Sequence, residues 1–140
     1  NHIPSLISMA KYELNRYSLD IAENYIKRAI DAITIYNERV QSGEVYYTYG
    51  RILEAKGDTD RAYDLYYKAY WAADCVAKAM TRIAVIDIKR KDYKNATRHA
   101  ENALDYGRKN NLAICALAIA LRKIGECEKA DIILKEHFKK

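Results

Sequence analysis

The chain has 140 residues, half of them apolar, and its 24 Lys and Arg against 19 Asp and Glu give a net charge of +5. A single proline, five glycines and no alternating β-branched runs favour an all-α protein. The longest uncharged run, Asn110 to Leu121, is too short to span a bilayer, which takes a helix of about 20 apolar residues. We therefore expect no membrane segment.

Residues 3–42 predict a pair of helices. Small and apolar residues recur there at helical spacing, at Leu6, Met9, Ala10, Ala22, Ile26 and Ala29. The segment is longer than the repeats that follow it, and its extra residues fall around Tyr36 to Gln41. We expect them to prolong the second helix until Ser42-Gly43 ends it, because glycine commonly follows a helix end.

Residues 43–76 show the same pattern most fully. The repeating positions hold Tyr46, Tyr49, Gly50, Leu53, Gly57, Ala62, Tyr66 and Ala69. Gly57-Asp58 reads as the turn between two helices. Since antiparallel helices approach closely only where side chains are small, the glycine and alanines predict a tight helical hairpin.

Residues 77–110 and 111–140 repeat this layout at a period of about 34 residues, which is typical of a solenoid. Asp87 interrupts an apolar face where the neighbouring segments have leucine, so we expect it to reach a polar partner or water. Tyr17 and Lys91 stand where the turn prefers glycine. Each requires either a strained left-handed residue or a different turn.

These residues resemble the tetratricopeptide repeat family, best over residues 43–76 and less fully over units 3–42, 77–110 and 111–140. The resemblance implies an α-solenoid of about eight helices, wound as a right-handed superhelix, forming one array over residues 1–140. It also implies a non-catalytic scaffold that binds a protein or peptide in a concave groove lined by the first helix of each unit.

At the groove positions, cations outnumber anions and the floor is apolar or aromatic, which favours a partner with acidic residues. The candidate binding residues are Lys11, Tyr47, Arg51, Lys78, Arg82, Lys89, Arg122 and Lys123. Lys78 and Arg82 match only the last pair of the carboxylate clamp found in some family members. Thr48 stands where that clamp needs asparagine, so capture of a C-terminal carboxylate is in doubt.

No catalytic motif is present, and no cofactor or metal is predicted. Cys75, Cys115 and Cys127 are odd in number and do not form a metal-binding pair, which favours a reducing, cytoplasmic setting. The three histidines are scattered along the sequence, and we interpret them as packing or surface residues.

Alternatives to a peptide groove remain open. Residues 77–110 carry a net charge of +5, which is compatible with unspecific nucleic-acid binding or with a solvated basic face. The chain begins without methionine, so the array is interpreted as part of a larger protein, such as a transcriptional regulator or an enzyme, in which it would serve as a sensor. Uncapped ends would also permit homo-oligomers.

Overall fold

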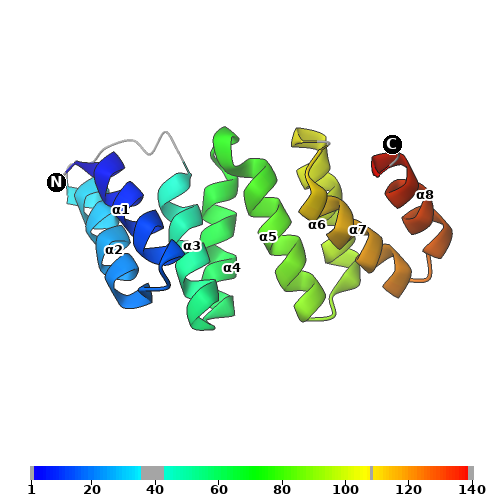
Figure 1. The fold of residues 1–140 in the computed structure, drawn as a ribbon, viewed down its shortest axis with the longest axis horizontal. Helices are drawn as coiled ribbons and strands as arrows, with labels where there is room; N and C mark the ends of the chain where they lie inside the picture. The colour runs from blue at the N-terminus through cyan, green and yellow to red at the C-terminus, as the bar shows by residue number, and fades with distance from the viewer. Residues whose placement is uncertain (1, 36–42, 108, 139–140) are drawn as a thin grey trace. The chain divides into compact units, whose positions relative to one another are not determined.

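The computed structural model describes residues 2–35, 43–107 and 109–138. Within these ranges the chain forms helices and no strands, which confirms the all-α class (Figure 1). The α-helices are α1 (Ile3–Asn15), α2 (Leu19–Ile35), α3 (Glu44–Lys56), α4 (Thr59–Tyr70), α5 (Val76–Lys89), α6 (Tyr93–Tyr106), α7 (Asn111–Lys123) and α8 (Cys127–His137). A short 3-10 helix, η1 (Ala73–Cys75), follows α4. The predicted prolongation over Tyr36 to Gln41 lies outside the described residues.

The helices form two compact units, Asn1–Cys75 and Val76–Lys140. In the first unit α1 packs on α2 and α3 on α4, and in the second α5 packs on α6 and α7 on α8 (Figure 1). The boundary coincides with the junction between the second and third predicted repeats. The single array over residues 1–140 stays a prediction.

All four hairpins turn in the same way. Tyr17, Gly57, Lys91 and Gly125 adopt left-handed φ angles of 63°, 91°, 62° and 92°. At Gly57 the backbone N–H donates to Glu54 O at 3.1 Å, and the next N–H, of Asp58, donates to Leu53 O at 2.9 Å. The same two hydrogen bonds close the other three turns. Of the two alternatives for Tyr17 and Lys91, the structure therefore has the left-handed residue.

The residue after each left-handed position immediately precedes the second helix. The side chains of Asp58 and Asp92 accept hydrogen bonds from the backbone N–H groups of Arg61 and Asn95, each at 3.4 Å. These N-caps satisfy amides that the first helical turn leaves without partners. One two-residue turn thus ends one helix and starts the next.

The close approach in the first unit is between Gly50 and Tyr66. A Cβ atom at Gly50 would lie 2.7 Å from a ring carbon of Tyr66, which is fully buried. The Tyr66 hydroxyl donates to Glu54 Oε1 at 2.7 Å, so its polar end is satisfied. Glycine at residue 50 is therefore what admits the tyrosine.

Two polar side chains are buried next to each other in the second unit. Asp87 on α5 and His99 on α6 are 2% and 4% exposed, and Asp87 Oδ2 lies 2.6 Å from His99 Nδ1. This confirms that Asp87 reaches a polar partner. Leucine occupies the equivalent of Asp87 in the neighbouring repeats, at Leu53 and Leu121, so the pair replaces an apolar contact.

No helix among the described residues is both long enough and apolar enough to cross a membrane.

Candidate partner-binding faces

In the first unit, some charged side chains at the predicted groove positions are engaged within the protein and Arg51 is not. Lys11 on α1 lies 2.8 Å from Glu44 on α3, measured from Nζ to Oε2. Glu54 accepts the hydrogen bond from Tyr66. Arg51 is exposed and makes no ion pair or hydrogen bond with another described residue. Tyr47 is half-buried, with its ring centroid 5.7 Å from that of Tyr66.

The second unit presents an apolar stripe along α7. Leu112 and Ile119 are each 46% exposed, and Cys115 between them is also exposed. Their spacing places all three on one side of the helix, while Leu117 and Leu121 are buried on the other. These three side chains form an exposed row on α7.

The predicted cations of the second unit lie on α5 and α7. Lys123 is exposed at the end of α7 and makes no ion pair or hydrogen bond with another described residue. Lys78, Arg82 and Lys89 lie on α5, and each interacts with other residues of the protein. Arg122 pairs with Asp131 on α8 at 2.8 Å. Of the eight predicted residues, Arg51 and Lys123 are thus the cations that the described structure leaves unengaged.

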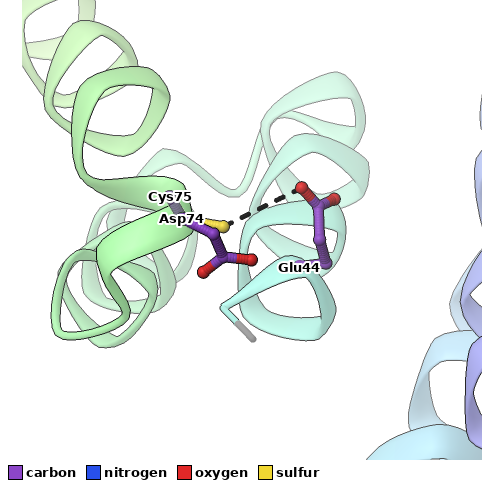
Figure 2. A group of neighbouring side chains, drawn as sticks. All are labelled: Glu44, Asp74 and Cys75. Carbon is purple, nitrogen blue, oxygen red and sulfur yellow. Dashed lines mark hydrogen bonds between the residues drawn. The ribbon is translucent and has the colours of Figure 1, made fainter. Parts of the chain in front are cut away.

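Three possible metal ligands that the sequence analysis did not assign lie together in the first unit. Donor atoms of Glu44, Asp74 and Cys75 are within 4.8 Å of one another (Figure 2). The Cys75 thiol donates to Glu44 Oε1 at 3.9 Å, and the Gly43 N–H donates to Asp74 Oδ1 at 3.2 Å. Burial, reinforced by Asp74, raises the pKa of Cys75 to about 11.

The cluster is best explained as a brace for the start of α3. Glu44 is held by the Lys11 ammonium as well as by the thiol, and Asp74 accepts from the first residue of the repeat. A thiol with a raised pKa is a poor nucleophile at neutral pH. Glu44 lies at the start of the repeat over residues 43–76, and Asp74 and Cys75 lie at its end. Sequence reasoning missed the cluster because these residues are far apart in the sequence.

A second polar network joins α2, α3 and α4. Lys56 Nζ lies 2.7 Å from both Asp20 Oδ1 and Glu23 Oε1. The Tyr49 hydroxyl donates to Glu23 Oε2 at 2.9 Å and accepts from Arg61 at 3.0 Å. Burial alone would raise the pKa of Glu23, but the hydrogen bonds from Lys56 and Tyr49 outweigh it and lower that pKa. The network links the two repeats of the first unit.

The repeated hairpins place this chain in the class of all-α helical-repeat proteins with tetratricopeptide-like architecture. Among solved structures it is similar to two crystal structures of MamA, a tetratricopeptide-like protein. One aligns with a TM-score of 0.83 over 99% of this chain and 78% of that chain, and the other with 0.81 over 99% and 72%. Both are 16% identical to this chain, so the likeness shows the fold. No family model and no curated protein matches the sequence.

Proposed function

We propose that this protein is a non-catalytic scaffold, and that the face of α5 and α7 binds an acidic, partly apolar segment of a partner protein. The observation that carries the proposal is the exposed stripe of Leu112, Cys115 and Ile119 beside Lys123. Helical-repeat folds of this class generally mediate protein–protein interactions, which supports the scaffold role.

Two kinds of contact would bind the partner. Apolar side chains of the partner would gain affinity by covering Leu112 and Ile119, while its carboxylates would meet the cations on α5 and α7. The second unit has 15 Lys and Arg against eight Asp and Glu, whereas the first has nine against 11. The second unit therefore attracts anions more strongly than the first.

The test is a fluorescence titration with a short peptide of alternating Leu and Glu, beside a Leu and Lys peptide of the same length. We expect Ile119→Asp to weaken binding of the Leu and Glu peptide about tenfold or more, because one large apolar contact is lost. Ile132→Asp on α8 is the matched control, since Ile132 is 55% exposed and lies outside this face. Equal losses in the two variants would contradict the proposal.

Lys123→Glu tests the charged half of the interaction. Its effect should be largest at low salt and should fade at high salt, because exposed charges are screened. Lys11→Glu and Arg51→Glu should weaken binding less, since both residues lie in the first unit.

The charge of the second unit also favours one alternative, unspecific binding of nucleic acid. A single-stranded oligonucleotide titrated across the same salt series separates the two functions. One outcome would replace the proposed function with unspecific nucleic-acid binding. In that outcome the protein binds the oligonucleotide equally well with and without Ile119→Asp and does not bind the Leu and Glu peptide.

A further inference from the structure

A hollow of about 300 Å³ opens in the second unit, away from the stripe on α7. Its floor is apolar, formed by Leu121 and Ile124 at the end of α7 and by Ile132 and Ile133 of α8. Thr97 and Glu101 on α6 form one side. None of Leu112, Cys115, Ile119 and Lys123 lines it, so it is separate from the proposed partner-binding face.

Two residues that line the hollow, Thr97 and Ile124, take the place of a hydrogen-bonded pair in the first unit. Counting by repeats, Thr97 corresponds to Glu23, Leu117 to Tyr49 and Ile124 to Lys56. In the first unit that tyrosine, glutamate and lysine are joined by hydrogen bonds of 2.7 to 2.9 Å. In the second unit the residues at these positions are shorter or apolar, so they cannot form that network.

The rim of the hollow is acidic on one side. Glu126 and Lys129 pair with each other at 3.5 Å. Glu101 is exposed and makes no ion pair or hydrogen bond with another described residue. One uncompensated carboxylate beside an apolar floor is complementary to an apolar side chain that is followed by a cation.

We propose that this hollow is a docking site for a segment of a partner protein in which a large apolar residue, such as Phe, precedes Arg or Lys. The apolar side chain covers Ile124 and Ile132, which are 42% and 55% exposed. The cation lies against Glu101. The partner's chemistry here is opposite in charge to that proposed for the face of α5 and α7.

The experiment follows the isoleucine methyl signals of the full chain by NMR during titration with acetyl-Ala-Phe-Arg-Ala-amide. Signals of Ile124, Ile132 and Ile133 should shift and saturate. Acetyl-Ala-Ala-Arg-Ala-amide should bind about tenfold or more weakly, because it lacks the apolar side chain. Acetyl-Ala-Phe-Glu-Ala-amide should bind about two- to fivefold more weakly, because an exposed ion pair contributes little.

The matched variant introduces the residues that the first unit has at these two positions. Thr97→Glu combined with Ile124→Lys recreates the Glu23–Lys56 pair and should abolish the shifts at Ile132 and Ile133, with the helical circular dichroism retained. Glu101→Lys, at an exposed site, should weaken the Phe-Arg peptide relative to the Phe-Glu peptide. Ile119→Asp should change neither result, which separates this site from the proposed function.

Absence of shifts at these methyls, or equal shifts with the Ala-Arg peptide, would overturn the proposal. Shifts that persist in a folded Thr97→Glu/Ile124→Lys variant would overturn it as well. If that variant does not fold, the Glu101→Lys variant decides. An unchanged preference of that variant for the Phe-Arg peptide over the Phe-Glu peptide would overturn the proposal.

Discussion

Because Gly50 has no side chain, the large ring of Tyr66 can pack against its backbone. Because the space for a Cβ atom at residue 50 is already taken by the Tyr66 ring, the two residues are coupled. The other repeats place Ala84 beside the smaller Ala100 and Ala118 beside Leu134 at the same positions. A larger residue at the position of Gly50 is therefore accompanied by a smaller residue at the position of Tyr66.

Gly50→Ala should destabilise the protein by about 1 to 3 kcal/mol through overpacking. Urea unfolding measures the change. In a Tyr66→Leu background, which has the smaller side chain found at Leu134, Gly50→Ala should destabilise the protein less. Equal costs in both backgrounds would show that the ring does not set the requirement for glycine.

The buried pair of Asp87 and His99 gives a sharper residue-scale test. Asp87→Leu should destabilise by about 1 to 3 kcal/mol, because it removes the carboxylate that is hydrogen-bonded to a buried imidazole nitrogen. Asp87→Leu with His99→Ile copies Leu121 and Ile133 of the next repeat, and should recover the wild-type stability to within about 1 kcal/mol or exceed it. A double variant no more stable than Asp87→Leu would contradict this account.

At the scale of the element, the turn between paired helices depends on backbone geometry. Lys91 holds the left-handed conformation that glycine adopts without cost, and its φ of 62° is close to that of Tyr17. Tyr17 also donates its hydroxyl to Ala55 O at 3.4 Å, so its side chain has a second role. Lys91 is therefore the cleaner position to test.

Lys91→Gly should stabilise the protein by about 0.5 to 1 kcal/mol, since it relieves the left-handed strain. Thermal and urea unfolding would detect the gain. Gly57→Ala is the converse control, because a Cβ there meets no atom within 4 Å and the change acts on the backbone alone. It should destabilise by about 1 kcal/mol. A loss of stability in Lys91→Gly would show that the lysine side chain matters more than its φ angle.

At the scale of the whole molecule, polar side chains join successive hairpins in the first unit and set its response to acid. The pKa of Glu23 lies below its ordinary value of 4.5 because Lys56 and Tyr49 donate to the carboxylate. The stability that these bonds contribute is present above about pH 4.5 and is lost as the pH falls through the lowered pKa.

Lys56→Met should therefore destabilise the protein at pH 7, and progressively less as the pH falls below about 4.5 and through the lowered pKa of Glu23. Unfolding midpoints across that pH range measure the difference from wild type. Lys94→Met is the control, since Lys94 is exposed and pairs with no described residue. A penalty for Lys56→Met that is independent of pH would exclude the carboxylate as its cause.

The repeat pattern predicted the helices and turns well, because its regular period reports contacts within each hairpin. It did not predict which charges pair. Lys11 meets Glu44 across two repeats, and Arg122 meets Asp131 on α8, although both cations occupy predicted groove positions. The hollow escaped prediction for a similar reason, since it is lined by side chains of neighbouring repeats.

The turns have a consequence for how such a chain changes over evolutionary time. Their hydrogen bonds join backbone atoms, so nearly every side chain in a hairpin can be exchanged while the bend persists. A lineage can then accumulate substitutions until little common sequence is left and still inherit the same shape. This chain and MamA, which are 16% identical, have the same fold at a TM-score of 0.83.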